Sequence, residues 1–321
     1  MLFKINILSV IFTLLACAGA SAQDYPARAV RLIVPFAAGG NADIIARIVG
    51  QKLGEALKQQ VIVDNRAGAN GVIGSEVAAK APPDGYTLLF VASGHAINPG
   101  MYAKLPFDPL RDFAPVALVS STPMTLTVTT SLPARSVKQL VALARSRPGV
   151  MSYASQGNGS PGHLAGALLN TLSGINIIHV PYKATAQALT DLTSGQVQVM
   201  YPSLTAVLPQ VRANRVRALA ITTRVRSKIA PELPTMAESG IADYEASIWN
   251  GVLAPAGTAP AIVSRLHDSL MRVVQSPDAR ERIMGAGADP LGGTPEEFGV
   301  FIAAEIRKWG KLIKDSGARL D

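Results

Sequence analysis

The chain has 321 residues, of which 48% are hydrophobic, and a formal net charge of +8. This length predicts two domains rather than one, and the apolar content excludes an intrinsically disordered protein. The basic residues are spread along the chain without a dense run or interleaved aromatic residues, which disfavours a nucleic-acid partner. Cys17 is the single cysteine, so a mature chain that starts after it has no disulfide, thiolate metal site or cysteine nucleophile.

Residues 1–22 have the pattern of an export signal peptide. A lysine supplies the positive start, residues 5–16 form an apolar run too short to span a bilayer, and residues 20–22 are a small-residue cleavage site. Residues 14–17 also resemble a lipoprotein box, in which Cys17 would be lipidated and retained. The small-residue site lies at the usual distance along a signal peptide, which favours simple cleavage there over lipidation of Cys17. No later stretch is long and apolar enough to predict a transmembrane helix.

The most informative stretch runs from Arg31 to Asp43 and reads RLIVPFAAGGNAD. Residues 32–36 predict a buried strand, and residues 37–40 predict a sharp turn of small residues. The apolar residues after this turn recur with helical spacing and predict a helix that starts near Asn41. Such a turn directs unpaired N–H groups and the positive end of a helix dipole at one spot, which suits an anion. An ordinary tight turn with Asn41 or Asp43 as helix cap has the same spacing.

The chain then alternates between strands and loops. Strands are predicted over 61–64, 86–91, 116–119 and 124–129. The second of these opens into a polar loop at 92–95, and Pro123 marks a crossing between domains. A strand over 150–154, a glycine-rich turn over 155–162 and a helix from His163 then repeat the arrangement of the first turn.

Further strands are predicted over 177–180, 196–201, 216–222 and 248–253, and helices over 136–145, 185–193, 261–274 and 295–313. Thr294, Pro295 and Glu297 form a capping box at the start of the last helix. This alternation predicts an α/β fold with mostly parallel sheets, in which ligands bind beyond the carboxyl ends of the strands. The informative loops all lie at such ends and predict two lobes facing one cleft; they are 36–43, 92–98, 155–163 and 181–185.

Seven segments between Asp24 and the C-terminus resemble the Bug (TctC-like) family of periplasmic substrate-binding proteins of tripartite tricarboxylate transport. They are IVPFAAGGNAD, VDNRAGANGVIG, PDGYTLLF, HAINPGMYAKLPFDPLRDFAPVALV, YASQGNGSPGHLAG, HVPYKATAQALTDL and PTMAESGI. The order and spacing of these segments make the resemblance specific.

The resemblance implies a type II periplasmic binding protein fold, in which two α/β lobes joined by crossing strands close over a ligand. Lobe 1 would contain residues 23–122 and 226–321, and lobe 2 residues 123–225. The implied protein is periplasmic, monomeric and non-catalytic, and it has no cofactor. Its ligand would be a small carboxylate (a dicarboxylate, a citrate-like acid, an acidic amino acid or an aromatic acid), and its partners the membrane subunits of a tripartite tricarboxylate transporter.

The resemblance also implies ligand contacts at particular residues of this chain. They are Phe36, Ala38, Gly39, Asn41 and Asp43 in the first loop, Ser93 and His95 in the second, Ser155, Gly157, Ser160 and His163 in the third, and Pro181, Tyr182, Lys183 and Ala184 in the fourth. The family usually has Ser or Thr in place of Asn41 and Gly in place of Ala184, whose methyl group would restrict positive φ. The implied pocket holds a carboxylate through backbone N–H groups, hydroxyls and waters, and the four loops contain no arginine.

Several of these candidates also have a purely structural interpretation. Asp43 would cap its helix, His95 and His163 would pack or brace loops, and Lys183 would point to solvent. The spacing of the histidines predicts no metal site.

Two other functions remain open. An exported α/β hydrolase would use Ser155 or Ser160, but residues 158–162 lack the first glycine of a G-x-S-x-G elbow and place a proline after the serine. A ligand-sensing module for a membrane signalling partner would have the same pocket as a transport protein.

Overall fold

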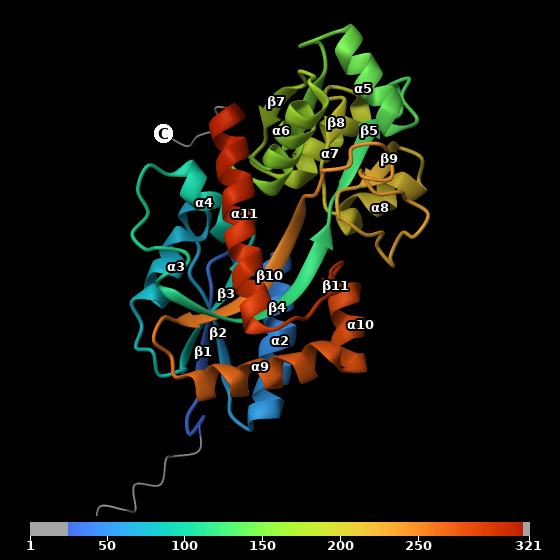
Figure 1. The fold of residues 1–321 in the computed structure, drawn as a ribbon. Helices are drawn as coiled ribbons and strands as arrows, with labels where there is room; N and C mark the ends of the chain where they lie inside the picture. Colours follow the sequence, from blue (N-terminus) through green and yellow to red (C-terminus); the bar gives the residue numbers. More distant parts are fainter. Residues whose placement is uncertain (1–24, 317–321) are drawn as a thin grey trace, which may run out of the picture.

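The computed structural model describes residues 25–316, so the predicted export signal with Cys17 lies outside the described residues. Two β-sheets, each flanked by helices, lie one above the other in Figure 1. We call the unit around the six-stranded sheet lobe 1 and the unit around the five-stranded sheet lobe 2. Within this range, no helix combines the length and apolar character needed to cross a bilayer.

Lobe 1 has the strand order β11-β4-β10-β3-β1-β2. Its strands are β1 (Val30–Val34), β2 (Val61–Asn65), β3 (Thr87–Ala92), β4 (Phe113–Pro123), β10 (Ser247–Pro255) and β11 (Asp289–Pro290). Its helices are α2 (Asn41–Leu57), the 3-10 turn η2 (Ala69–Gly71), α3 (Val72–Ala79), α4 (Gly94–Met101), α9 (Pro260–Gln275), α10 (Pro277–Gly285) and α11 (Pro295–Ser316).

Lobe 2 has the strand order β7-β6-β8-β5-β9. Its strands are β5 (Thr125–Thr129), β6 (Ser152–Ser155), β7 (Ile178–Pro181), β8 (Val199–Met200) and β9 (Val216–Ile221). Its helices are α5 (Val137–Ser146), α6 (Pro161–Ser173), α7 (Thr185–Ser194) and α8 (Leu204–Arg212).

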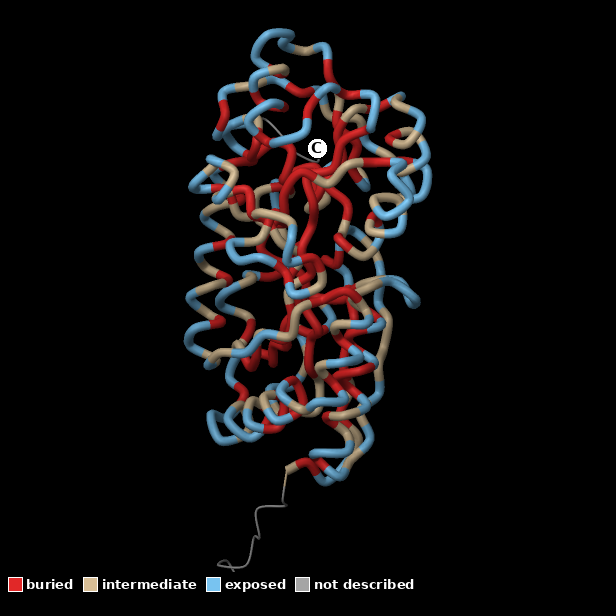
Figure 2. Tube along the Cα trace, turned by 90° about the vertical axis from the view of Figure 1, so that its right-hand side faces the viewer, coloured by how far each residue is buried: buried red, intermediate tan, exposed pale blue. Residues whose placement is uncertain are grey.

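Helices cover both faces of the lobe 1 sheet because their apolar side chains recur with helical spacing. In α2, Ile45, Val49 and Leu53 lie on one side and are fully buried. Helices α2, α9 and α10 form one apolar layer with the sheet, and α3, α4 and α11 pack on its other face. Figure 2 shows the buried segments running through the middle of both lobes, with exposed segments around them.

The sheets are mixed, which corrects the prediction of mostly parallel sheets. Strand β1 is parallel to β2 and β3, and β6 is parallel to β7 and β8, but β10 is antiparallel to β3 and β4. Strand β5 is likewise antiparallel to β8 and β9. The chain passes from lobe 1 to lobe 2 through β4 and β5 and returns through β9 and β10. The returning strands lie beside the outgoing ones and therefore run in the opposite direction.

The predicted crossing at Pro123 is confirmed. Strand β4 ends there in the lobe 1 sheet, and β5 begins at Thr125 in the lobe 2 sheet. Two buried hydrogen bonds join the outgoing crossing to the returning one, because Thr222 donates its N–H and its hydroxyl to the carbonyl of Met124, each at 3.0 Å. The two crossings therefore form one connected hinge region between the lobes.

Some elements differ from those predicted. Residues 94–101 form helix α4 rather than a loop, and α8 was not predicted, because Pro99 and Pro209 lie inside these two helices and disfavour a helix from sequence. Helix α10 was not predicted either. Strand β8 contains only Val199–Met200 instead of 196–201. The predicted capping box is confirmed: Glu297 accepts the N–H of Thr294 at 2.8 Å and donates its own N–H to the Thr294 hydroxyl at 3.2 Å.

Helix α11 packs against both lobes, since it contacts α4 and β4 in lobe 1 and α6 in lobe 2. A buried carboxylate ties it to the returning strand: Glu305 Oε2 accepts the indole N–H of Trp249 at 3.2 Å and that of Trp309 at 2.9 Å. Lys308 pairs with the other oxygen of Glu305. Both tryptophans, which lie far apart in the sequence, are thus held by one acidic side chain beside the hinge.

Candidate ligand-binding site

The first predicted loop connects β1 to α2, as expected, and Ala38 and Gly39 are exposed. Helix α2 begins at Asn41 behind Gly40, and no side chain caps it within the described structure. Its first N–H groups are therefore left for solvent or a ligand. The N–H of Gly39 differs, because it donates to Asp43 Oδ2 at 2.8 Å.

Asp43 braces this loop from behind. Its carboxylate is 2% exposed and also accepts Arg47 Nε at 3.0 Å and Asn65 Nδ2 at 2.9 Å. The same amide of Asn65 donates to the carbonyl of Phe36 at 3.0 Å. Burial opposes the charge on Asp43, but the hydrogen bonds from Arg47, Gly39 and Asn65 outweigh it and lower the pKa of this carboxyl. Because its oxygens are engaged internally, Asp43 shapes the loop rather than pointing into the cleft.

Replacing Asp43 with asparagine is expected to reduce the free energy of unfolding by about 1–2 kcal/mol at neutral pH, because the amide cannot accept all three donors. The pKa is lowered in the folded state, so the charged form stabilises the fold above the unfolded value of 3.8 and loses this contribution as the pH falls through the folded value. Urea unfolding from pH 7 to pH 3 should therefore show the difference shrinking below about pH 4. The exposed Asp243→Asn serves as control, and a difference independent of pH would contradict this assignment.

The second loop follows β3 and contributes buried polar groups at the same edge of the sheet. Ser93 is buried, and its N–H donates to the Trp249 carbonyl at 3.1 Å. Asn250, which faces Ala92 in the β3–β10 pair, is fully buried, and its Oδ1 accepts the Ser120 hydroxyl at 3.4 Å. Its Nδ2 has no hydrogen-bond partner among the described residues. A buried amide donor is thus available at this edge of the sheet. No sequence signal distinguished Asn250 from the other residues of its strand.

His95 lies in α4 and packs away from this edge. Its ring is 6.0 Å from that of Phe107 and 5.2 Å from that of Phe113, and its Nε2 lies 2.9 Å from the carbonyl of Pro109. Burial lowers the pKa of His95 to about 4, so the ring is neutral at physiological pH. The structure therefore gives His95 a packing role, which differs from the predicted ligand contact because residues 94–101 form a helix that turns the ring inward.

The third loop joins β6 to α6, and its two serines are bonded within lobe 2. Ser155 Oγ accepts the N–H of Gly157 at 3.1 Å and lies 2.6 Å from Nε2 of His179. Ser160 caps α6 by accepting the N–H of His163 at 3.2 Å. The ring of His163 lies behind the loop, where its Nδ1 accepts the N–H of Gly159 at 3.1 Å. His163 thus braces the loop, as the structural interpretation predicted.

The fourth loop lies beside the third, because the N–H of Tyr182 donates to the Ser155 carbonyl at 3.0 Å. Pro181 ends β7, and the hydroxyl of Tyr182 donates to Asp191 at 2.8 Å. Lys183 is exposed. Ala184 precedes α7 with φ −142°, an extended conformation that any residue adopts, so its methyl group causes no backbone strain. Helix α7, like α2, starts without a side-chain cap from the described part of the chain.

The two lobes approach each other at the turn that follows α10. Asn41 Nδ2 donates to the carbonyl of Ala286 at 2.9 Å, which places the start of α2 beside this turn. Gly287 lies against the start of α8: a Cβ atom added to Gly287 would be 2.3 Å from Thr205 Cγ2. Among residues 25–316, no side-chain hydrogen bond caps α8 either. Uncapped helix starts from lobe 1 and lobe 2 therefore lie on either side of one short turn.

The starts of α8 and α6 are neighbours within lobe 2. A Cβ atom on Gly162 would lie 3.4 Å from the carbonyl of Tyr201, three residues before α8 begins. The glycine-rich loop of lobe 2 is thus connected through α8 to the turn that contacts α2. The sequence predicted that donors from two lobes meet, but it did not identify Thr205 or Gly287, because α8 and α10 were missed.

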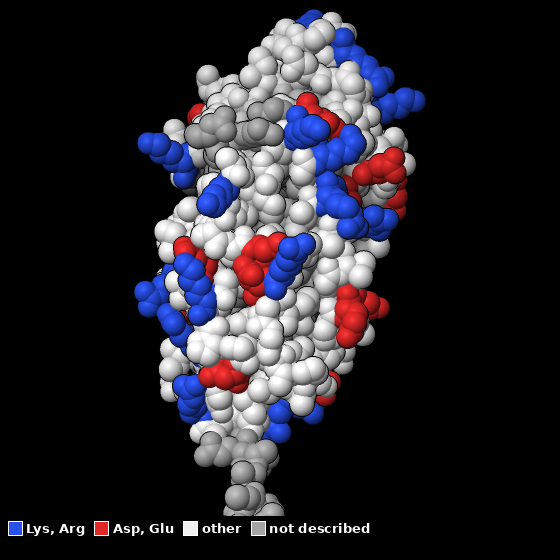
Figure 3. Space-filling model, turned by 60° about the vertical axis from the view of Figure 1, so that its left-hand side comes forward, with Lys and Arg blue, Asp and Glu red and all other residues white. Residues whose placement is uncertain are grey.

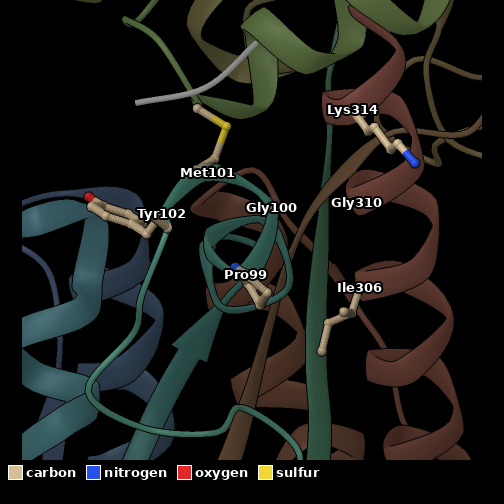
Figure 4. A pocket seen from close by; sticks show the side chains of 8 residues that line it. Pro99, Gly100, Met101, Tyr102, Ile306, Gly310 and Lys314 are labelled. Atoms are coloured by element: carbon tan, nitrogen blue, oxygen red, sulfur yellow. The ribbon is translucent and has the colours of Figure 1, made fainter. Parts of the chain in front are cut away.

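A cavity of about 540 Å³ lies elsewhere, between the end of α4 and α11. Figure 4 shows the Tyr102 hydroxyl and the Lys314 amine pointing to opposite sides of it, while Met101 and Ile306 supply apolar surface. Because its polar groups do not converge, this cavity lacks the arrangement that fixes a charged ligand.

Two arginines at the molecular surface are each paired with a carboxylate. Arg224 pairs with Glu245 at 2.7 Å and Arg226 with Glu238 at 2.9 Å. Figure 3 shows basic and acidic side chains interspersed over the middle and lower part of the face it displays. No cluster of three or more potential metal ligands occurs between residues 25 and 316.

A family model described as TctC, the tripartite tricarboxylate transporter family receptor, matches residues 45–318. The chain belongs to the TctC family. This membership confirms the predicted family, and it identifies the protein as a solute-binding receptor of the TctC type rather than a member of an enzyme family.

Relatives of this TctC-family receptor cover nearly its whole length. It is 38% identical to Protein BugT of Bordetella pertussis, over 98% of both chains. The structure of Rpa4515 from R. palustris with adipate matches 92% of this chain and 100% of its own, with 39% identity and a TM-score of 0.78. MatC from Rhodopseudomonas palustris with bound malate matches 90% of this chain and 100% of its own, with 30% identity and a TM-score of 0.74. These matches confirm the predicted two-lobe binding-protein fold.

Proposed function

We propose that this receptor captures a small carboxylate in the periplasm and delivers it to the membrane subunits of a tripartite tricarboxylate transporter. The observation that carries the proposal is the pair of uncapped helix starts, α2 in lobe 1 and α8 in lobe 2, on either side of the turn at Ala286 and Gly287. Unpaired N–H groups and the positive ends of two helix dipoles favour an anion between them. The relatives solved with adipate and malate support this ligand class.

The ligand contacts that we propose come from the four predicted loops. Phe36, Ala38, Gly39 and Asn41 would serve in lobe 1 with Ser93, and Ser155, Gly157, Ser160, Pro181, Tyr182, Lys183 and Ala184 in lobe 2. Asn250 is added to this set because its buried Nδ2 has no partner among residues 25–316, and Thr205 is added because it lies at the lobe contact. Asp43 and His163 act from behind their loops. Closure of the lobes would then compete with an open state, whose population the ligand reduces.

We also propose the remaining organisation predicted from the sequence. The mature protein starts after residue 22, lobe 1 comprises residues 23–122 and 226–321, and lobe 2 comprises residues 123–225. The continuous apolar contacts of α11 with both lobes support a monomer that needs no second chain to complete its core.

Adipate or malate is expected to raise the unfolding temperature of the purified protein by several degrees at about 100 times its dissociation constant, where binding adds about 2.7 kcal/mol. Thermal-shift measurements, followed by titration calorimetry, would test this with a panel of dicarboxylates, acidic amino acids and aromatic acids. Hexane-1,6-diol is the matched control for adipate, because it has the same chain length without carboxylates. If no acid stabilises the protein, or if the diol stabilises it equally, the proposal is wrong.

A hydrolase is the second candidate, because Ser155 Oγ lies 2.6 Å from His179 Nε2, as a nucleophile lies beside its base. Ser155 is 1% exposed and its oxygen also accepts the N–H of Gly157. In the described part of the chain no carboxylate bonds the other nitrogen of His179, so the third member of a triad is missing. Turnover of 4-nitrophenyl acetate that disappears in Ser155→Ala would favour the hydrolase over the receptor.

A further inference from the structure

Two histidines form a stack behind the glycine-rich loop of lobe 2. The rings of His163, in the first turn of α6, and His179, in β7, have centroids 3.9 Å apart and planes 16° apart. We call this pair the histidine stack. Both rings line a cavity of about 520 Å³ that also includes Ile175 and Ser316, and Gly287 is not among its lining residues.

Each ring of the stack holds one part of the loop. His163 Nδ1 accepts the N–H of Gly159 at 3.1 Å. His179 Nε2 lies 2.6 Å from Ser155 Oγ, and that oxygen in turn accepts the N–H of Gly157 at 3.1 Å. Gly157 and Gly159 have φ values of +107° and +73°. Glycine adopts positive and negative φ about equally readily, so a loop without these contacts would sample other conformations as well. The stack therefore selects one conformation of the loop.

We propose that the histidine stack positions residues 155–162 for ligand capture, acting through Ser155 and Gly159 without touching the ligand. This inference rests on the proposed function, since it assumes that the loop binds the carboxylate. It gives His179, which lies in the strand predicted over residues 177–180, a role equal to that of His163.

The histidine stack can hold residues 155–162 in this conformation only while both rings are neutral. A protonated His163 Nδ1 would be a donor and could not accept the N–H of Gly159, and two charged rings at this separation would repel each other. Burial lowers the pKa of His163 to about 4, and burial together with the neighbouring His163 lowers that of His179 to about 4. An unconstrained histidine has a pKa near 6.5. The ordered loop therefore loses stability as the pH falls from about 6.5 toward 4.

The groups packed around the histidine stack do not stabilise the positive charge of a protonated ring. Tyr153 lies 5.0 Å from the His179 ring, and its hydroxyl donates to the His163 carbonyl at 3.1 Å. Helix α11 contributes Ser316 to the shared cavity. The carboxylate of Asp191 accepts the Tyr182 hydroxyl at 2.8 Å. Among the described residues, His163 is thus the charged or titratable group that acts on His179, and no carboxylate stabilises either imidazolium.

Four variants test the proposal. His163→Asn places an amide oxygen near the position of Nδ1, and His179→Gln places one near Nε2, so both can keep the hydrogen bond without titrating. His163→Leu and His179→Leu remove it. Amide hydrogen exchange of the peptide containing residues 155–162 reports on the loop without ligand, and calorimetry with adipate and malate reports on affinity, each from pH 7.5 to pH 4.5.

We expect faster exchange of this peptide in both leucine variants and an affinity lower by about tenfold, which corresponds to one hydrogen bond to a loop group. Exchange in α2 should be unchanged. The asparagine and glutamine variants should bind within about threefold of the wild type at pH 7.5, and their affinity should decline less than that of the wild type on acidification. The decline that remains comes from protonation of the ligand's own carboxylates.

Wild-type exchange and affinity in the leucine variants would overturn the proposal. A decline in affinity on acidification that is as steep in both His163→Asn and His179→Gln as in the wild type would also overturn it. These two variants keep the test valid if the leucine variants do not fold. If wild-type protein binds no acid while the loop still exchanges faster in the leucine variants, the proposed function fails but the positioning of the loop by the stack holds.

Discussion

Replacing Glu305 with alanine is expected to lower the free energy of unfolding by about 4 kcal/mol, because it leaves two buried indole N–H groups without an acceptor. Trp249 Nε1 and Trp309 Nε1 both donate to Glu305 Oε2, and both tryptophans are at most 1% exposed. The variant also leaves Lys308 without its partner. Since Trp249 lies in β10 beside the hinge and Trp309 in α11, we expect this substitution to weaken the attachment of α11 as well.

Urea unfolding followed by tryptophan fluorescence measures this change directly, because the chain's two tryptophans both lie at Glu305. Glu305→Gln keeps one acceptor oxygen and should lose less stability than Glu305→Ala. Glu76→Ala is the surface control, since its carboxylate pairs with the exposed Lys80 and should contribute less than about 0.5 kcal/mol. Equal losses in Glu305→Ala and Glu76→Ala would show that the indoles do not depend on this carboxylate.

Gly287→Ala is expected to weaken ligand binding by about 10- to 100-fold, because the lobes could no longer approach at the turn after α10. The added Cβ would be 2.3 Å from Thr205 Cγ2 and 2.4 Å from Thr205 Oγ1. Gly287 also has φ +86°, a conformation that costs other residues about 1 kcal/mol. The clash acts between lobe 1 and lobe 2, so it penalises the closed state that holds the ligand.

Gly240→Ala separates the clash from the backbone strain. Gly240 has φ +100°, and a Cβ atom added there meets nothing within 4 Å. Both variants should therefore lose a similar amount of stability through strain, but only Gly287→Ala should lose affinity for adipate or malate in calorimetry. Equal affinities of the two variants would mean that the contact of Gly287 with Thr205 does not limit closure. The double variant Gly287→Ala/Thr205→Ala, which removes Cγ2 and Oγ1, should recover part of the lost affinity.

The residues that brace the candidate site depend on partners at very different distances along the chain. Asp43 accepts the N–H of Gly39, only four residues away, although the sequence indicated a helix cap at Asp43 rather than this bond to the turn. Asn41, in contrast, donates to Ala286, which is 245 residues away. A pattern within a short window cannot contain such a contact, so the turn after α10 was absent from the predicted site.

The sequence by itself determined the elements whose signals are local. The small-residue turn before Asn41, the capping box at Thr294 and the crossing at Pro123 all depend on residues within a few positions of each other, and the family resemblance followed from short segments in order. Only the tertiary structure decided which donors remain unpaired, how the strands of each sheet are oriented, and which way the histidine rings face. The physical reason is that a buried N–H group is free or bonded according to its neighbours in space, and in this fold those neighbours come from the other half of the chain.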